Sequence, residues 1–309
     1  MKERGGSESA RKNVKLLIGP WTHNVDLVQR VGGGVDYGVA AAGNDLLVDQ
    51  RLRWFDYWLK GVDNGVMEEP PVRIFVMGEN VWRDENEWPL ARTAYTSYYL
   101  RSDGRANTCR GDGRLGPESP GNVEFDAFIY DPRNPAPTKG GMIKERFVDG
   151  GSLDQAEIEE RADVLVYTTP PLERDLEVTG PVIVKLFAAS SAPDTDFTAK
   201  LVDLWPDGRA TLITDGIIRA RYRESETSPS LIEPGKVYEY TIDLIATSNV
   251  FKAGHQIRVD ISSSNFPRFD RNPNTGHPFG QDDQLEIAVQ RIFHGKDHPS
   301  RIILPIIPR

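Results

Sequence analysis

The sequence predicts a mainly β protein, in which a jelly-roll β-sandwich follows a short α/β segment. Two observations support this prediction. Most of the chain consists of short runs of β-branched and aromatic residues separated by turn signals such as Pro206-Asp207-Gly208, a pattern typical of antiparallel sandwiches. Near the N-terminus, by contrast, one apolar run precedes a single amphipathic helix. Of the 309 residues, 39% are hydrophobic, which is enough for a sizeable core.

The first predicted element is a strand over Val14–Ile18. Its sequence, VKLLI, is short and mostly apolar, and Gly19-Pro20 ends it. Runs of this kind are typical of buried strands in parallel sheets. A glycine-rich loop over Val31–Gly38 follows.

The next element is a helix over about Asp45–Lys60. Four large apolar residues recur at helical spacing and share one face; they are Val48, Leu52, Phe55 and Leu59. Trp54 and Trp58 widen that face. Asn44 is the predicted N-cap, and Gly61 suits the position just past the C-terminal end.

The remaining chain reads as short strands. They are Val72–Met77, Tyr95–Leu100, Val123–Ile129, Val164–Tyr167, Val182–Ala188, Thr198–Val202, Thr211–Ile213, Val237–Leu244, Gln256–Ser262, Leu285–Arg291 and Arg301–Ile307. A short helix is predicted over Asp154–Arg161, and loops over Arg101–Asn122 and Asp131–Gly141.

The pattern changes near residue 65, which predicts two parts. Residues 1–64 hold a strand, a loop and a helix, too little to fold alone, whereas residues 65–309 form a complete β domain. The parallel-type strand has no partner among residues 1–64. We therefore expect the first part to be the C-terminal end of a truncated α/β domain.

The composition limits the kinds of binding partner and the cellular compartment that we expect for this protein. Lys and Arg number 37 against 46 Asp and Glu, for a net charge of −9, so nucleic-acid binding is not expected. The sequence has no apolar run of membrane length and no secretory leader, which predicts a cytoplasmic protein. The single cysteine, Cys109, excludes an intrachain disulfide and a multi-cysteine zinc site. The sequence leaves a homo-oligomer open.

The pentapeptide Gly19-Pro20-Trp21-Thr22-His23 directly follows the predicted buried strand. Reactive groups of open α/β folds lie at the carboxyl ends of strands, and an imidazole there can act as a general base near neutral pH. On spacing alone an ordinary loop histidine is the more common case, so both interpretations stay open.

Several segments together resemble the CocE/NonD serine hydrolases, the group of cocaine esterase, α-amino-acid ester hydrolase and X-Pro dipeptidyl-peptidase. The segments occur in one order along nearly the whole chain. They are GPWTH at Gly19–His23, RWFDYWLKG at Arg53–Gly61, VMGENVWR at Val76–Arg83, DPRNPAPTKGG at Asp131–Gly141, LEVTGPV at Leu176–Val182, SAPDTDFTAKLVD at Ser191–Asp203, GHQIRVDISSSNFPRFDRN at Gly254–Asn272 and HPSRIILPIIP at His298–Pro308. The match corresponds to the C-terminal portion of such enzymes.

The resemblance implies a role and a fold. It implies that His23 is the base of a Ser-Asp-His triad, that residues 1–64 are the end of an α/β-hydrolase domain, and that residues 65–309 form a galactose-binding-like jelly roll. It implies no metal and no organic cofactor. The expected substrate is a small ester, amide or peptide, and the expected partner is the missing catalytic domain.

The chain departs from the family in what precedes His23. In α/β-hydrolases the serine and the acid come before the histidine, but only 22 residues lie upstream here, with no Asp among them. The sequence contains no G-x-S-x-G elbow. We therefore expect the chain alone to be inactive.

Other polar residues have structural explanations that we favour. Asp194 and Asp196 form a D-x-D pair that could bind Ca²⁺, but turn carboxylates of this kind more often accept backbone N–H groups. His294 and His298 have i, i+4 spacing without an evident third ligand. His255, at the start of a predicted strand, is expected to be structural.

Four further features carry weaker signals. His277 lies in a predicted turn, and residues 32–34 are glycines without the spacing of a phosphate loop. Asp26 and Asp36 are the acids nearest to His23 in sequence, although the resemblance gives neither the triad role. Residues 266–270 read equally as a surface facing a catalytic domain or as a packed β corner.

Two functions from different classes follow. The first is the C-terminal part of a serine hydrolase that cleaves esters or amides, of acyl or X-Pro dipeptidyl type, in which a serine attacks the acyl carbonyl and His23 moves the proton. The alternative is a free-standing β-sandwich that binds carbohydrate or protein. The sequence does not separate peptidase, esterase and acylase, because few residues near the scissile bond belong to this chain.

Overall fold

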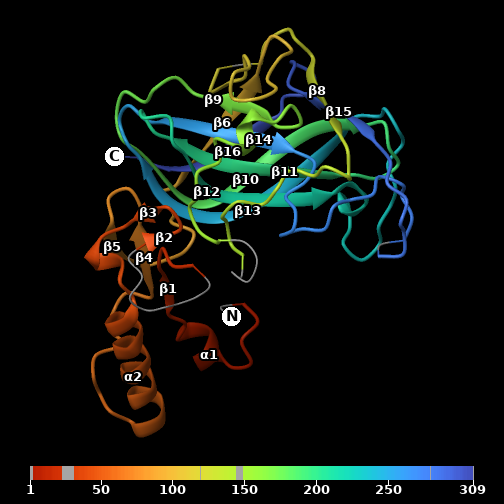
Figure 1. Cartoon of the computed structure of the whole chain (residues 1–309). Helices are drawn as coiled ribbons and strands as arrows, with labels where there is room; N and C mark the ends of the chain where they lie inside the picture. The colour runs from red at the N-terminus through yellow and green to blue at the C-terminus, as the bar shows by residue number, and fades with distance from the viewer. Residues whose placement is uncertain (1–2, 23–30, 119, 144–148, 279, 309) are drawn as a thin grey trace.

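The computed structural model describes residues 3–22, 31–118, 120–143, 149–278 and 280–308. Figure 1 shows a large β part and a smaller N-terminal part from which one helix extends away. No helix in these residues is long and apolar enough to span a bilayer.

The large part is one sheet that folds over on itself into two layers. Its strands, within the described residues, are β6 (Ala94–Arg101), β7 (Arg114–Gly116), β8 (Phe125–Tyr130), β9 (Leu165–Thr168), β10 (Leu176–Ser190), β11 (Asp196–Leu204), β12 (Ala210–Arg219), β13 (Tyr238–Phe251), β14 (Gln256–Ser262), β15 (Ala288–Phe293) and β16 (Arg301–Ile307). The pairing order is β12-β11-β14-β9-β7-β6-β16-β10-β15-β8, and β13 pairs with β10. All pairs are antiparallel except β7 with β9.

The core of the sandwich lies between the two layers. Strands β8 and β15 alternate buried and exposed residues, so one face of each packs on the core while the other meets solvent. The largest fully buried side chains include Tyr130, Tyr167, Tyr240, Phe197 and Phe251. The predicted mainly β fold is thus confirmed.

The strand predictions differ from the structure mainly in length. Those for Gln256–Ser262 and Arg301–Ile307 match β14 and β16 at both ends. Strand β10 begins at Leu176, because the chain passes Gly180-Pro181 with a bulge instead of ending there. Gly180 has φ +139° and lies against Pro305, where a Cβ would be 2.9 Å from the proline ring carbon.

Four short pieces of structure were not predicted or differ in type. Strand β5 (Val81–Glu85) is mostly polar, and strand β7 is only three residues long, so neither has a strand pattern in the sequence. The Val31–Gly38 loop contains a small ribbon of β2 (Val31–Gly32) and β3 (Val35–Asp36). The predicted helix over Asp154–Arg161 is a single 3₁₀ turn, η2 (Ile158–Glu160).

The N-terminal part holds a βαβ unit. Strand β1 (Leu16–Ile18) runs parallel to β4 (Val72–Val76), which pairs with β5 in the order β1-β4-β5. The expected parallel strand therefore exists, but its partner comes from beyond residue 65, which the sequence pattern did not indicate. The small core of this sheet is Val72, Ile74 and Val76, which pack on Val250 of the sandwich. The division into residues 1–64 and 65–309 stays a prediction.

Helix α2 (Asn44–Lys60) connects β1 to β4. Its predicted N-cap was wrong, because Asn44 is already helical and Gly43 occupies the cap position. At the other end, Gly61 adopts φ +70° and donates its N–H to the carbonyl of Tyr57, as predicted. The apolar face of the helix, with Leu52, Phe55 and Leu59, is exposed. A short helix α1 (Glu8–Lys12) precedes β1.

Candidate functional site

The predicted catalytic segment leads into a cleft between the two parts of the molecule. Strand β1 ends at Ile18, and Gly19–Thr22 then run along a cleft of about 440 Å³. His23 and Asp26 lie outside the described residues. Thr22, the last described residue before this gap, lines the cleft.

Aromatic side chains build the N-terminal wall of this cleft. The indole of Trp21 donates its Nε1–H to the carbonyl of Ala41 at 2.7 Å and packs on Trp82, with ring centroids 5.7 Å apart. The ring lies so close to Gly19 and Gly43 that a Cβ at either would come within 2.6 Å of it. The two glycines therefore allow the indole to fix the turn before His23.

Two more surfaces close the cleft. The sandwich contributes Ile213–Asp215 from β12 and Ala246–Ser248 from β13. A third wall consists of two chain segments, Lys139–Ile143 and Asp149–Leu153, which we call the wall arms. Gly141 and Gly151 join the arms by two backbone hydrogen bonds of 2.8 and 2.9 Å. Met142, Ile143 and Ser152 of the arms line the cleft.

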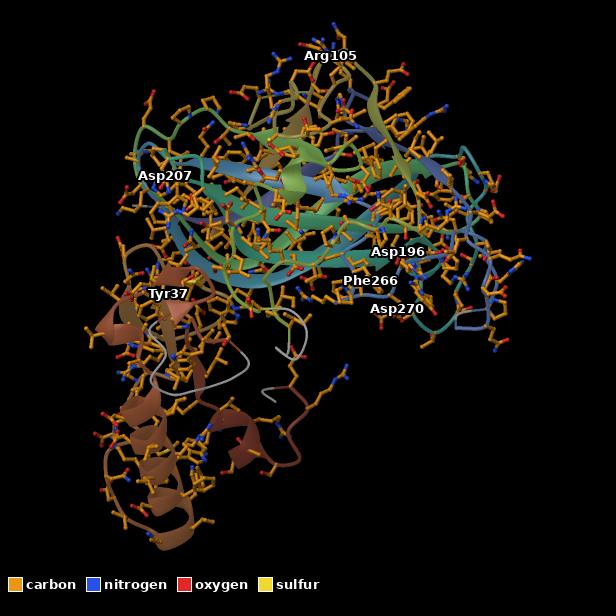
Figure 2. The ribbon with its side chains drawn as sticks, in the orientation of Figure 1. Tyr37, Arg105, Asp196, Asp207, Phe266 and Asp270 are labelled. Atoms are coloured by element: carbon orange, nitrogen blue, oxygen red, sulfur yellow. The ribbon has the colours of Figure 1, made fainter. Side chains whose placement is uncertain are left out.

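Tyr37 joins the wall arms to the N-terminal part. Its hydroxyl donates to Ser152 Oγ at 3.0 Å, and the N–H of Gly34 donates to the Ser152 carbonyl, also at 3.0 Å. Figure 2 shows Tyr37 at the junction of the two parts. Burial raises the pKa of Tyr37, and the negative charge of Asp203 adds to that effect although the Ser152 contact opposes it. The phenol is therefore neutral near pH 7.

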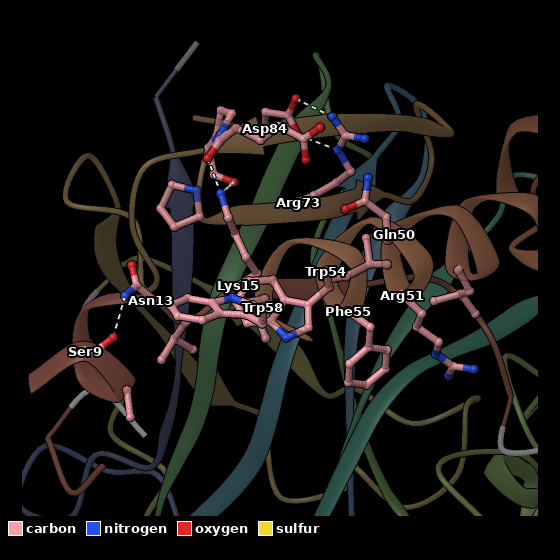
Figure 3. Close-up of a pocket in the computed structure, with 18 of the residues that line it drawn as sticks. Ser9, Asn13, Lys15, Gln50, Arg51, Trp54, Phe55, Trp58, Arg73 and Asp84 are labelled. Carbon is pink, nitrogen blue, oxygen red and sulfur yellow. Dashed lines mark hydrogen bonds and ion pairs between the residues drawn. The ribbon is translucent and has the colours of Figure 1, made fainter. Parts of the chain in front are cut away.

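A larger hollow, of about 730 Å³, lies elsewhere on the N-terminal part (Figure 3). Trp54, Phe55 and Trp58 of α2 line it opposite Leu16 of β1. None of residues 19–22 takes part in it. Gly19–Thr22 line the smaller cleft and not this hollow, so the smaller cleft is the candidate site.

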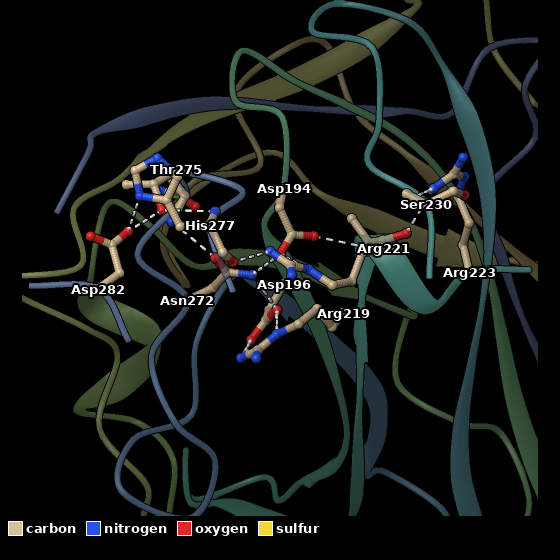
Figure 4. A network of polar contacts seen from close by, with 12 residues as sticks. Asp194, Asp196, Arg219, Arg221, Arg223, Ser230, Asn272, Thr275, His277 and Asp282 are labelled. Atoms are coloured by element: carbon tan, nitrogen blue, oxygen red, sulfur yellow. Dashed lines mark hydrogen bonds and ion pairs between the residues drawn. The ribbon is translucent and has the colours of Figure 1, made fainter. Parts of the chain in front are cut away.

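The other predicted acids are paired or lie in turns. Asp36 accepts the N–H of Gly38 at 2.8 Å in an exposed turn. Asp194 accepts the backbone N–H of Arg221, as expected of a turn carboxylate, and also pairs with its guanidinium at 2.8 Å (Figure 4). Asp196 binds Arg219 through both oxygens, at 2.8 and 3.0 Å. Arginine thus neutralises both members of the D-x-D pair.

The described histidines have separate surroundings. His255 is buried and contacts Asp203 through Nδ1 at 2.9 Å, whereas His277 is exposed and contacts Asp282 at 3.0 Å. His298 packs between the rings of Phe187 and Phe293. Within the described residues, no group of three or more His, Cys, Asp or Glu side chains is placed to hold a metal ion.

A serine, a histidine and an aspartate do meet in the structure, but not as a triad. Ser102 Oγ lies 3.1 Å and Asp126 Oδ2 lies 2.9 Å from the same ring nitrogen, Nε2 of His294. In a triad the acid and the serine contact opposite nitrogens of the ring. All three side chains are also buried in the sandwich. Nothing in the sequence signals this cluster, because its members lie up to 192 positions apart.

Comparison with known proteins decides the family. Residues 64–303 match the X-Pro dipeptidyl-peptidase C-terminal non-catalytic domain. The chain belongs to this family. It is 47% identical over 302 residues to the cocaine esterase of Rhodococcus sp. (strain MB1 Bresler), covering 96% of this chain and 52% of the esterase. It is also 30% identical over 216 residues to a putative Xaa-Pro dipeptidyl-peptidase of Bacillus anthracis, covering 69% and 32%.

Solved structures agree with this assignment. An aminopeptidase from a marine sediment archaeon, Thaumarchaeota archaeon, superposes with a TM-score of 0.84 at 30% identity, over 96% of this chain and 49% of that one. An α-amino-acid ester hydrolase superposes with a TM-score of 0.81 at 27% identity, over 94% and 50%. The resemblance to the C-terminal portion of CocE/NonD hydrolases is thus confirmed. The chain spans about half the length of the cocaine esterase and of these two solved structures, and about a third of the Bacillus anthracis relative.

Residues 266–270 form a turn on the sandwich in which Phe266, Pro267 and Asp270 are exposed, so both interpretations stay open. Phe266 exchanges backbone hydrogen bonds with Ala136 and Thr138, at 3.0 and 2.6 Å. Figure 2 shows Phe266 and Asp270 on the sandwich, away from Tyr37 at the junction. Arg268, between them in sequence, instead pairs with Asp215 at the cleft.

The Asp203–His255 pair predicts a pH dependence of stability. Burial raises the pKa of Asp203 to about 6, although the contact with His255 opposes the shift. A carboxyl with a raised folded pKa favours folding below its unfolded pKa, near 4, and loses that contribution as the pH rises through 6. Between pH 4 and pH 7 the wild type should lose up to about 3 kcal/mol relative to Asp203→Asn.

Urea unfolding followed by circular dichroism at pH 4, 5, 6 and 7 measures this difference. The exposed Asp207 lies on the same hairpin, so Asp207→Asn serves as the matched control and should not reproduce the effect. Parallel stability curves for the wild type and Asp203→Asn would show that the prediction is wrong.

Proposed function

We propose that this chain is the base-bearing and cleft-walling part of a serine hydrolase that cleaves esters or amides. The observation that carries the proposal is the path of Gly19–Thr22, which leave the carboxyl end of a parallel strand and line a mostly apolar cleft directly before His23. Relatives named as an esterase and a putative dipeptidyl-peptidase add support; the match covers 52% of the first and 32% of the second.

The chemistry follows from the residues at the cleft. A serine from outside these 309 residues attacks the acyl carbonyl while His23 accepts its proton. His23 then returns the proton to the leaving oxygen or nitrogen, and a water molecule repeats the sequence to release the acid. Apolar walls at Trp21, Phe75 and Ile143 hold the acyl group and exclude bulk water. The neutral phenol of Tyr37 fixes the arms rather than moving protons, since Ser152 holds it.

The experiment completes the chain with a relative. We expect the chain alone to hydrolyse p-nitrophenyl acetate no faster than free imidazole and to bind no fluorophosphonate probe. A chimera joining this chain to the part of the Rhodococcus cocaine esterase outside the matched region should regain hydrolysis and label on one serine, because nucleophile, acid and oxyanion donors are then present.

Two outcomes contradict the proposal. Labelling of a serine in the chain alone, with turnover above that of imidazole, would place the nucleophile inside it. A folded chimera without hydrolysis would favour the binding-module alternative. A parallel assay with Gly-Pro-p-nitroanilide separates dipeptidyl-peptidase from esterase activity.

A further inference from the structure

The outward face of the sandwich near the cleft is charged yet buried. Lys200 of β11 lies opposite Asp215 of β12 on one side and Asp260 of β14 on the other. Only 6, 2 and 3% of these three residues is exposed. Outward faces of sandwich strands normally meet water, so a layer of chain must cover these charges.

The covering layer includes the two wall arms. Gln155, just after the second arm, accepts a hydrogen bond from Lys200 Nζ at 2.9 Å and donates one to the carbonyl of Lys139 at 2.8 Å. Ion pairing between Arg258 and Glu159 anchors the chain further along. The arms that line the cleft on one side therefore rest on buried charges on the other.

The ion pair of Asp215 with Arg268 lies directly behind the arms. Arg268 Nη1 donates to Asp215 Oδ1, and Asn265 Nδ2 donates to Asp215 Oδ2 at 2.9 Å. A Cβ at Gly141 would be 2.8 Å from Arg268 Nη1 and 3.2 Å from Asp215 Oδ1. Gly141, with φ +85°, thus places bare backbone on the ion pair, and the next residue, Met142, lines the cleft.

We propose that Asp215 and Arg268 are positioning residues that set the wall arms and thereby the size of the acyl group that the cleft accepts. The inference rests on the proposed function. The arms have two supports: Tyr37 and Gly34 bind Ser152 on the N-terminal side, and the ion pair lies against Gly141 on the sandwich side. Removing the second support leaves Met142 and Ile143 free to shift, which changes the cleft where an acyl chain lies.

Two substitutions of Arg268 distinguish the effect of its positive charge from the effect of its side-chain length. Arg268→Met keeps the length of the side chain but leaves Asp215 buried without its cation. Arg268→Lys keeps a cation that can reach Asp215 Oδ1 and so should rescue most of the effect. Arg219→Met is the matched control, because Arg219 forms a comparable buried pair with Asp196 on the same sheet but lines a different groove.

The measurement is kcat/KM of the chimera for p-nitrophenyl acetate and p-nitrophenyl hexanoate. We expect Arg268→Met to change the ratio of the two values by about tenfold, mainly through KM for the hexanoate, since one misplaced apolar contact has effects of this size. Arg268→Lys and Arg219→Met should stay within about twofold of the parent. An active chimera whose ratio is unchanged by Arg268→Met would overturn the inference.

A second readout keeps the inference testable if the chimera proves inactive, in which case the proposed function fails. Hydrogen exchange of the Gly141 and Gly151 amides in this chain reports the bridge between the arms. Arg268→Met should accelerate both amides at least about tenfold while Arg219→Met leaves them unchanged. Unaltered protection in Arg268→Met would show that the ion pair does not position the arms.

Discussion

His23→Ala in the chimera should lower kcat for p-nitrophenyl acetate by at least about a thousandfold. Without the imidazole the attacking serine keeps its proton, while the oxyanion donors and substrate binding sustain only a small residual rate. Folding should be preserved, because the substitution removes a residue that follows a loop rather than one from the sandwich core.

The assay compares kcat and KM with circular dichroism as the folding check. His277→Ala is the matched control: this imidazole is exposed, contacts Asp282 and lies outside the cleft, so its loss should leave kcat unchanged. If the His23 variant keeps more than about a tenth of the parent kcat, an effect under about 1.4 kcal/mol, His23 is not the catalytic base.

Asp126→Ala should destabilise the chain by about 3–5 kcal/mol, the largest stability effect expected of a single residue here. Four donors converge on this buried carboxylate: Ser102 Oγ at 2.7 Å, Tyr167 OH at 2.8 Å, His294 Nε2 at 2.9 Å and the N–H of Ala106 at 3.0 Å. Burial acts to raise the pKa of Asp126, but the bonds from His294, Ala106 and Ser102 outweigh it and lower the pKa. Alanine would leave the hydroxyl of Tyr167 and the N–H of Ala106 without this acceptor in the core, and Ser102 and His294 would keep only their mutual contact.

Urea unfolding at pH 7 measures this loss. Ser102→Ala is the control, since it removes one donor and leaves Asp126 with the other three, at a cost of about 1 kcal/mol. Ser102→Ala also tests whether this cluster takes part in catalysis. In the chimera, this variant should keep both activity and fluorophosphonate labelling. An Asp126→Ala variant as stable as Ser102→Ala would mean that the cluster contributes little.

Strand prediction succeeded where a local pattern and its stop signals agreed. Residues 256–262 and 301–307 combine β-branched residues with clear turns, so β14 and β16 were located at both ends. It failed for β5, whose sequence VWRDE is mostly polar, and for the start of β10, which was predicted at Val182 and lies at Leu176. In β10 the bulge accommodates the proline without a ladder hydrogen bond, and that depends on the neighbouring strands.

The candidate site was also predicted only in part. Eight segments in one order identified the family, and the GPWTH motif among them marked His23 as the expected base. The cleft lined by Gly19–Thr22 could not be predicted, because Thr22, Phe75, Ile143 and Asp215 meet only when four separate segments pack together. The glycines at 19 and 43 are explained only by the indole of Trp21 that lies against both.

The sequence by itself determined the class of fold, the family and the histidine that we propose as the base, since all three depend on runs of neighbouring residues. Only the tertiary structure decided that β1 pairs with β4, that Asp194 and Asp196 each pair with an arginine, and that Arg268 pairs with Asp215 at the cleft. The physical reason is the range of the interactions. Side-chain alternation and turn preference act within a few residues, whereas Arg268 and Asp215 are 53 positions apart and acquire a partner only once the sheet has formed.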